Sequence, residues 1–277
     1  MIFDAAIIST MVSSGADFYH FLVKSGFLML GKPLPIYVIT VRSFVDRHRH
    51  IEKMAEKFGF SFEYVWRYDA DELTDGELSK VCSSLSRKSA SNVLKHIYAQ
   101  QLFLETGSDV ALILEDDVVI FDSFFRGLNK VLSLAEKLTP GWLIFLAGAD
   151  NKMDARFFEA TELDLINSPL TTAEAYVIDR HGCEQRARWL KENTISCQAD
   201  HQLKLIDQEL GLTHYCVSTP LATQGSITGL FATSLDSSRS KHGSLFLRVK
   251  YEYNRLRRQT AVRFIAKIKR VLSCHIR

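Results

Sequence analysis

Three consecutive carboxylates, Glu115-Asp116-Asp117, directly follow an apolar run at residues 111–114 and precede Val118-Val119-Ile120. The short apolar run predicts a buried strand. Carboxylates at its end are costly to bury unless a cation compensates their charge. Hard divalent cations such as Mg2+ or Mn2+ take oxygen ligands, and open α/β sheets bind ligands at strand ends. The triplet therefore predicts a metal and phosphate site; the alternative is a solvated turn in which Asp116 or Asp117 caps the next segment.

The charge of the chain is unevenly distributed. The 277 residues, 47% of them hydrophobic, suffice for one large domain and carry a net charge of +2. Residues 248–277 contain ten Lys or Arg and one acid, a net charge of +9, whereas the rest contains 24 bases and 31 acids, a net charge of −7. The sequence thus predicts an acidic body and a basic tail.

Cysteine spacing and the N-terminal segment set further expectations. The five cysteines are far apart and form no CxxC pair, so we expect neither a structural zinc site nor a disulfide framework, and a reducing compartment fits best. Residues 1–34 contain an apolar patch that is too interrupted for a spanning helix and lacks the features of a signal peptide. We expect them to form an N-terminal extension.

Apolar periodicity predicts strands and helices that alternate through most of the body. The expected strands are residues 36–40, 60–66, 111–114, 142–147 and 172–178, and the expected helices are residues 44–58, 91–105, 121–138 and 183–192. This alternation predicts a βαβ-type sheet with helices on both faces. The glycine-rich signatures GxGxxG and GxxxxGK[ST] are absent. A bound nucleotide would therefore need another phosphate anchor, such as a metal that bridges carboxylates to a diphosphate.

Several segments, in order along residues 35–228, resemble glycosyltransferase family 25, the lipooligosaccharide galactosyl- and glucosyltransferases of Gram-negative bacteria. The matching segments are Thr40-Val41-Arg42-Ser43 with Arg47, Asp69-Ala70, Lys95-His96, residues 102–107, residues 112–118, Ala175-Tyr176-Val177-Ile178, Gln198-Ala199-Asp200 and residues 220–224. The chain departs from the family where Thr40 replaces the common Asn, where Lys95 replaces Ser, and over residues 84–92.

The resemblance implies an α/β fold of GT-A type with a mixed central sheet, and the sequence of the tail adds a C-terminal basic amphipathic helix. We therefore expect a GT-A-like catalytic domain at residues 35–244, flanked by the extension at 1–34 and the basic tail at 245–277. The implied reaction is the inverting, metal-assisted transfer of a hexose, galactose or glucose, from a UDP-sugar to a lipooligosaccharide or related glycan.

The same resemblance assigns roles to individual residues. Asp117, Asp116 and Glu115 would hold Mn2+ or Mg2+, which would neutralise the leaving diphosphate. The donor would contact Thr40, Arg47, Asp69 and Asp116, and the acceptor Tyr176 and Gln224. Asp200 would act as the base on the acceptor hydroxyl.

Each role has a simpler alternative. Asp200 would instead cap a helix that begins near His201, and Arg47 would be a solvated surface group. Tyr176 would be a core aromatic of a strand. Glu115, which would bind the metal through water or orient the other acids, would instead be a packed or capping acid. For His96, among apolar residues of a helix, we favour a core histidine over a metal ligand.

The tail predicts an amphipathic helix. Apolar residues gather on one face at Ala261, Val262, Ile265, Ile268 and Leu272, and basic residues on another at Arg263, Lys267 and Arg270. Such a helix favours an anionic membrane surface, which would place the enzyme beside a glycolipid acceptor on the cytoplasmic face of the bacterial inner membrane. A solvated helix is the alternative, and no nucleic-acid partner is expected because the body is acidic.

Two other functions use the same residues. One is a metal-dependent phosphoryl-transfer or hydrolytic enzyme built on the acidic triplet. The other is a degenerate glycosyltransferase fold that acts as a binding module at the membrane.

Overall fold

The computed structural model describes residues 28–29, 32–148, 162–168 and 172–231, together with seven single positions between 249 and 264. Its centre is a seven-stranded mixed sheet with the strand order β4-β3-β5-β9-β7-β10-β8. These strands are β3 (Ile36–Ile39), β4 (Glu63–Val65), β5 (Val110–Glu115), β7 (Trp142–Phe145), β8 (Leu165–Asn167), β9 (Ala175–Asp179) and β10 (Thr213–Val217).

Antiparallel pairing interrupts the parallel order at two places. β3 pairs in parallel with β4 and β5, and β10 with β7. β9 lies antiparallel between β5 and β7, and β8 lies antiparallel at the edge beside β10. The predicted α/β class with a mixed central sheet is therefore confirmed.

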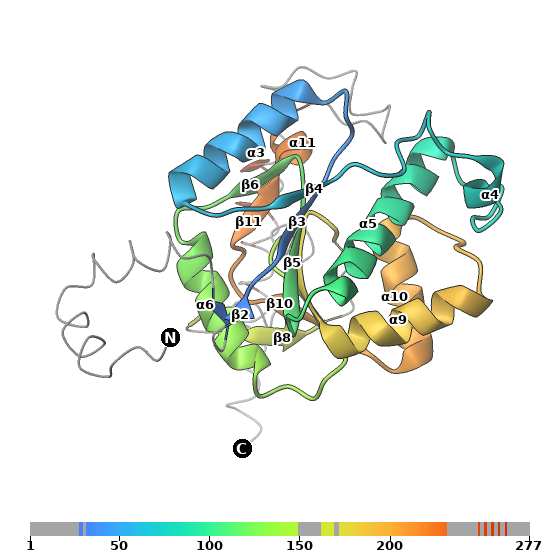
Figure 1. Cartoon of the computed structure of the whole chain (residues 1–277). Coiled ribbons are helices and arrows are strands. Elements are labelled where there is room, and N and C mark those ends of the chain that lie inside the picture. Colours follow the sequence, from blue (N-terminus) through green and yellow to red (C-terminus); the bar gives the residue numbers. More distant parts are fainter. Residues whose placement is uncertain are drawn as a thin grey trace, which may run out of the picture.

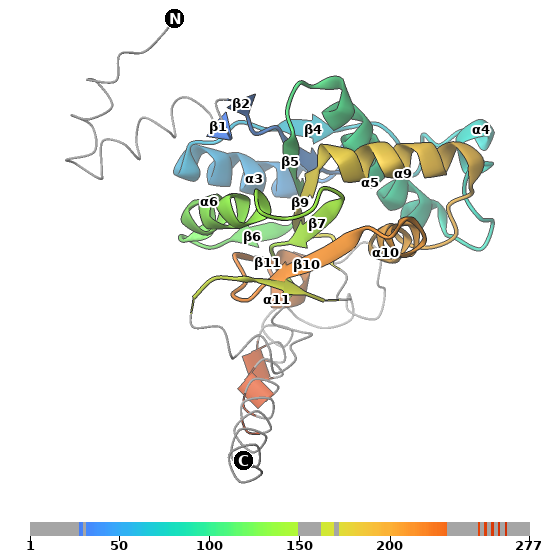
Figure 2. The same cartoon turned by 90° about the horizontal axis from the view of Figure 1, so that it is seen from below.

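Helices cover both faces of the sheet, as Figures 1 and 2 show. One face packs against α3 (Val45–Phe58) and α6 (Phe124–Ala135), and the other against α5 (Arg87–Glu105), α9 (Arg180–Glu192) and α10 (Ala199–Leu210). The strand β5 explains this arrangement, because its consecutive residues face opposite sides. Leu112 and Leu114 enter the first core, and Ala111 and Ile113 enter the second.

A small sheet extends from the triplet. β6 (Val118–Ile120) follows β5 after a two-residue turn and pairs antiparallel with β11 (Ala222–Gln224). The short helix α11 (Gly225–Thr228) continues directly from β11. The remaining elements are the short helix α4 (Asp75–Leu78) and the two-stranded ribbon of β1 (Leu28–Met29) and β2 (Lys32–Pro33).

Element boundaries differ modestly from the sequence expectations. α3 and β3 lie where they were predicted, whereas α5 begins four residues earlier than expected because the Ser86 hydroxyl accepts a hydrogen bond from the Ser89 amide. β4 is shorter than predicted, and β6, β8, β10 and β11 were not predicted as sheet strands.

The extension at 1–34 and the tail at 245–277 lie largely outside the described residues, so their predicted roles stay predictions. In the described part of the chain, no helix combines the length and the apolar character needed to cross a bilayer.

Candidate functional site

A pocket of about 430 Å³ opens where β3 and β5 end. Because these strands run in parallel, with Ile39 opposite Glu115, their carboxyl ends meet at one edge of the sheet. The pocket lining comes from the start of α3, from residues 70–71, from α5 and from the β11–α11 connection. It includes Thr40, Phe44, Arg47, Lys88, Asn92, Lys95, Glu115, Asp116, Asp117, Gln224 and Ser226. The structure thus brings together six of the nine residues that the sequence assigned to the site.

Both carboxylate oxygens of Asp116 are engaged. The Thr40 hydroxyl donates to Oδ2 at 2.7 Å, and Arg47 donates to Oδ1 at 2.6 Å. Because the Thr40 proton points to Asp116, His48 Nε2, which lies 2.9 Å from Thr40 Oγ1, acts as the donor to Thr40. Burial raises the pKa of Asp116, and Arg47 and Thr40 oppose that rise.

Asp117 is the under-compensated acid of the triplet. Its Oδ1 is buried and makes no hydrogen bond within the described residues, and its Oδ2 lies 3.9 Å from Arg47. Burial and then the charge of Glu115 raise the pKa of Asp117 to about 7, against the opposing charge of Arg47 and a hydrogen bond from Ser226. A buried carboxylate that lies beside other acids favours a proton or a cation.

Glu115 is held by amide and imidazole groups. Asn92 Nδ2 and His96 Nε2 lie 3.4 Å from its Oε1, and Gln224 Nε2 lies 3.4 Å from its Oε2. Burial acts to raise the pKa of Glu115, but the His96 contacts, with Asn92 and Arg47, outweigh it and lower the pKa. Glu115 is therefore ionised in the neutral pH range.

The β11–α11 connection packs closely on the triplet. The Gly225 amide donates to the Asp117 carbonyl at 2.7 Å. A Cβ at position 225 would lie 2.7 Å from that carbonyl oxygen and 2.8 Å from the Phe231 ring, so only glycine fits there. Phe231 and Phe44 flank the Arg47 guanidinium, with ring centroids 5.5 and 4.7 Å from Cζ. The aromatic rings thus hold Arg47 against the carboxylates.

The donor set suits a hard divalent cation at Asp117. Its buried, unpartnered Oδ1 is an oxygen of the type that Mg2+ and Mn2+ take, in a pocket lined by further hydroxyl and amide groups. No group of three or more His, Cys, Asp or Glu side chains within the described residues has a metal-binding arrangement. In this arrangement Arg47 and Thr40 donate to Asp116, and amide and imidazole groups contact Glu115.

Three predicted site residues lie away from the pocket lining. Asp69 is buried 2.6 Å from Lys95 Nζ and accepts the Arg42 amide at 3.0 Å. Tyr176 is fully buried, and its hydroxyl lies 2.9 Å from His96 Nδ1. Asp69 therefore contacts the pocket residue Lys95. Tyr176 contacts His96, which in turn contacts the pocket residue Glu115. Their predicted substrate contacts stay predictions.

Asp200 lies in the first turn of α10. Gln198 is the N-cap of that helix, so Asp200 does not occupy the capping position that the simpler alternative gave it. Its Oδ1 lies 2.9 Å from both the backbone N and the ring Nδ1 of His201. The role of Asp200 as a base stays a prediction.

Sequence reasoning missed Asn92 and Ser226 as pocket residues. A signal for Asn92 was present, because Asn92 and His96 are four residues apart on one helix and so share a face. His96 has partners on both ring nitrogens, as expected for a core histidine.

No family model and no curated protein matches the chain. Among solved structures it is similar to a galactosyltransferase, LgtC, in complex with donor and acceptor sugar analogs, with a TM-score of 0.36, 12% identity and coverage of 62% of this chain and 69% of that chain. It is also similar to apo mouse xyloside xylosyltransferase 1, with a TM-score of 0.39, 9% identity and coverage of 65% and 83%. A third similar structure is the inositol-1-phosphate CTP transferase of T. maritima, with a TM-score of 0.34, 10% identity and coverage of 85% and 82%.

Proposed function

We propose that the chain is a metal-assisted, inverting glycosyltransferase that moves a hexose from a UDP-sugar to a lipooligosaccharide or related glycan. The observation that carries the proposal is the unpartnered, buried Oδ1 of Asp117 in a pocket at the carboxyl ends of parallel strands. The ordered resemblance to glycosyltransferase family 25 supports the choice of reaction.

The size and charge of the pocket suit a nucleotide diphosphate donor. Its volume of about 430 Å³ lies within the range of small-molecule sites. Arg47 and Lys88 line it together with the three acids. In the proposal these cations contact the diphosphate, and Thr40 keeps the Asp116 carboxylate oriented through its 2.7 Å hydrogen bond.

Asp117 and Asp116 would hold the Mn2+ or Mg2+ ion, and Glu115 would keep the local charge negative through its fixed position. A bound divalent ion supplies Lewis-acid stabilisation of the leaving diphosphate. Gln224 lines the pocket and donates to Glu115, and in the proposal it also contacts the acceptor.

Asp200 remains the proposed base on the acceptor hydroxyl, on the sequence resemblance alone. Replacing it with Asn should remove transfer while leaving UDP binding intact. Near-normal transfer by that variant would exclude this assignment.

The basic tail is proposed to bind an anionic membrane surface on the cytoplasmic face of the inner membrane. The proposal rests on the excess of ten Lys or Arg over one acid in residues 248–277, which favours an anionic surface.

A thermal-shift screen tests the donor proposal. UDP-galactose, UDP-glucose and UDP, each with and without Mn2+, should raise the melting temperature, and Mn2+ should increase the effect, because ligands that bind the folded state stabilise it. A protein that responds to no uridine nucleotide at any Mn2+ concentration would contradict the proposal.

A further inference from the structure

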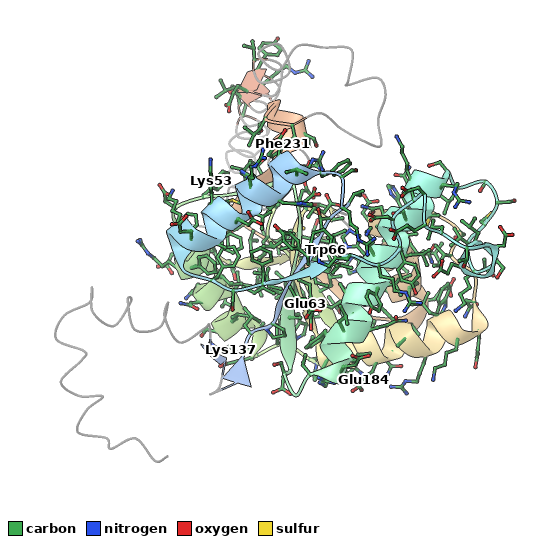
Figure 3. The ribbon with its side chains drawn as sticks, turned by 45° about the horizontal axis from the view of Figure 1, so that its top comes forward. Lys53, Glu63, Trp66, Lys137, Glu184 and Phe231 are labelled. Carbon is green, nitrogen blue, oxygen red and sulfur yellow. The ribbon has the colours of Figure 1, made fainter. Side chains whose placement is uncertain are left out.

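A second groove runs along the free edge of β4, apart from the triplet pocket. It encloses about 360 Å³ and is lined by Arg42, Glu63, Tyr64, Trp66, Arg67, Tyr68, Glu72, Glu77, Tyr98 and Leu102. Figure 3 shows Trp66 and Glu63 along this edge, with α3 between them and Phe231, which stacks on Arg47. The groove and the triplet pocket share no lining residue, although residues 66–72 and α5 contribute to the region between them.

Tyr64 and Trp66 line the groove and end a row of aromatic side chains that starts in the core. Phe60, Phe62, Tyr64 and Trp66 alternate along the β4 segment, with neighbouring ring centroids 6.1, 4.8 and 4.6 Å apart. This row begins in the core at Phe60 and ends at Trp66, which is 36% exposed. An exposed tryptophan at a sheet edge is a liability unless it has a partner to cover it.

A second aromatic pair faces the groove from its other wall. The Tyr68 and Tyr98 rings meet edge to face at 5.7 Å, and the Arg67 guanidinium lies over both, 4.7 and 5.3 Å from the ring centroids. These contacts fix the ring orientations, so a ligand would meet a preformed surface.

The backbone of this wall is held in an unfavourable conformation. Tyr68 has a φ of 73°, which costs energy for an aromatic residue. Ser91 donates to the Tyr68 carbonyl at 2.5 Å, and Lys95 Nζ donates to the Arg67 carbonyl at 2.9 Å, which stabilises the strained turn. Strain that the surroundings maintain in this way marks functional positions more often than packing positions.

The polar groups of the groove are of mixed sign. Two arginines and three glutamates line it, and the exposed Arg42 and Glu72 pair at 2.5 Å. Phosphate-rich ligands would face three carboxylates, so the groove does not suit a nucleotide. Carboxylates and guanidinium groups together suit hydroxyls, which both donate and accept hydrogen bonds.

An added peptide strand fits this edge less well. Lys95 Nζ lies within 3.3 Å of three consecutive carbonyl oxygens, those of Val65, Trp66 and Arg67. β4 ends at Val65, and the Trp66 and Arg67 carbonyl oxygens beyond it already accept from Lys95, so a regular backbone ladder could extend over the three residues of β4 alone.

We propose that the β4-edge groove binds a pyranose unit of an oligosaccharide, with Trp66 as the stacking platform and the Arg42, Arg67 and Glu72 side chains as hydroxyl partners. A pyranose ring combines an apolar C–H face with a rim of hydroxyls, which matches the aromatic surface and the mixed charges of the groove. The site is separate from the donor pocket and does not depend on the proposed transfer activity.

A glycan array of neutral and acidic hexose oligosaccharides tests the proposal, with the full chain applied without nucleotide or added metal. We expect binding to at least one hexose oligosaccharide, with an affinity that isothermal titration calorimetry measures. Trp66→Ala should weaken it at least about tenfold, and Trp66→Phe, which keeps a smaller ring, should weaken it less. Trp189→Ala is the matched control, because Trp189 lies on α9 and donates to Glu209, so binding should change by less than about twofold.

Saturation-transfer NMR on the unmodified chain gives a readout that does not depend on the stability of a variant. The sugar C–H protons of the bound glycan should receive saturation from aromatic ring protons. An array without any bound glycan, binding that survives Trp66→Ala, or competition by UDP would each overturn the proposal. Failure here leaves the UDP thermal shifts untouched, so the two proposals are tested separately.

Discussion

Arg47 places a positive charge beside two carboxylates of the triplet. Its guanidinium contacts Asp116 at 2.6 Å and lies 3.9 Å from Asp117, so it occupies the place of a cation between two carboxylates. A divalent ion bound there would meet a positive charge at close range. In the proposed function, Arg47 would oppose metal binding in the absence of nucleotide and would attract the diphosphate when nucleotide is present.

This dual contact predicts effects of opposite sign for Arg47→Met. We expect Mn2+ to bind about tenfold more tightly to the variant without nucleotide, and UDP to bind at least about tenfold more weakly. Titration calorimetry measures both affinities. Arg49→Met is the control, because Arg49 is exposed on the same helix and pairs with Asp46. Loss of both affinities in the Arg47 variant would show that the guanidinium does not compete with the metal.

Replacing Asp117 with Asn should stabilise the fold and remove function. At pH 8 its buried carboxylate lies beside two other acids with one oxygen unpartnered, which costs free energy. Asp117→Asn should raise the free energy of unfolding by about 1–3 kcal/mol without metal and abolish the Mn2+-dependent rise in melting temperature. Urea unfolding and thermal shift measure the two effects. Asp46→Asn, at an exposed position, should change neither appreciably; a destabilised Asp117→Asn would mean that the carboxylate is compensated.

At the scale of elements, the β11–α11 connection positions the pocket wall. Gly225 lies against the Asp117 carbonyl, so Gly225→Ala should displace α11, with a loss of about 1–3 kcal/mol in stability and a weaker UDP affinity. Gly107→Ala is the matched control, because an added Cβ there meets nothing within 4 Å. Unfolding and UDP titration of both variants check this, and equal behaviour would mean that the connection is pliable.

A second junction joins α9, α10 and β10 through buried charges. Arg186 forms a bidentate pair with Asp207 at 2.6 and 2.7 Å, and His214 contacts Asp207 Oδ2 at 2.5 Å. Asp207→Asn should cost about 3–5 kcal/mol, because it leaves the Arg186 charge buried without a counter-ion. Asp122→Asn, in an exposed pair with Lys57, should cost less than about 1 kcal/mol.

The same junction sets part of the acid sensitivity of the fold. Burial acts to raise the pKa of Asp207, but Arg186 and His214 outweigh it and lower the pKa below its ordinary 3.8. The stabilisation is therefore complete above about pH 4 and is lost as the pH falls through the lower folded-state pKa. Urea unfolding between pH 6 and pH 3 should show a steeper loss for the natural chain than for Asp207→Asn. Parallel pH profiles would contradict this account.

The sequence predicts long, continuously apolar elements well and short ones poorly. Residues 111–114 and 142–145 are apolar without interruption, which is typical of strands buried on both faces, and both form central strands. β6 and β11 have three residues each, so no period is visible in them. Their pairing, which closes one side of the pocket, depends on contacts about 100 residues apart.

The site was predictable where residues follow the ends of neighbouring strands. Thr40 comes directly after β3, and Asp116 comes directly after β5. Because these strands are parallel neighbours, the residues that follow them lie close together. The burial of Lys95 against Asp69 was not predictable, because lysine is rarely buried and its partner lies in another segment. Burial is also what separates Tyr176 from the pocket, and burial depends on the complete fold.

At the scale of the whole molecule, an acidic body and a basic tail predict a defined orientation at an anionic surface. Removing residues 245–277 should abolish co-sedimentation with vesicles of phosphatidylglycerol and leave UDP binding unchanged. Vesicles of phosphatidylcholine alone are the control, because they lack the negative surface potential. Unchanged co-sedimentation of the truncated chain would remove the membrane proposal.

In the proposed function, the triplet pocket transfers a hexose from a nucleotide sugar. The most direct measurement is the release of UDP from UDP-galactose and UDP-glucose with Mn2+, with and without purified lipooligosaccharide. We predict UDP release that the acceptor accelerates, that yields a glycan heavier by one hexose in mass spectrometry, and that Asp117→Asn abolishes. UDP release that is independent of any acceptor, or that persists in Asp117→Asn, would contradict the account.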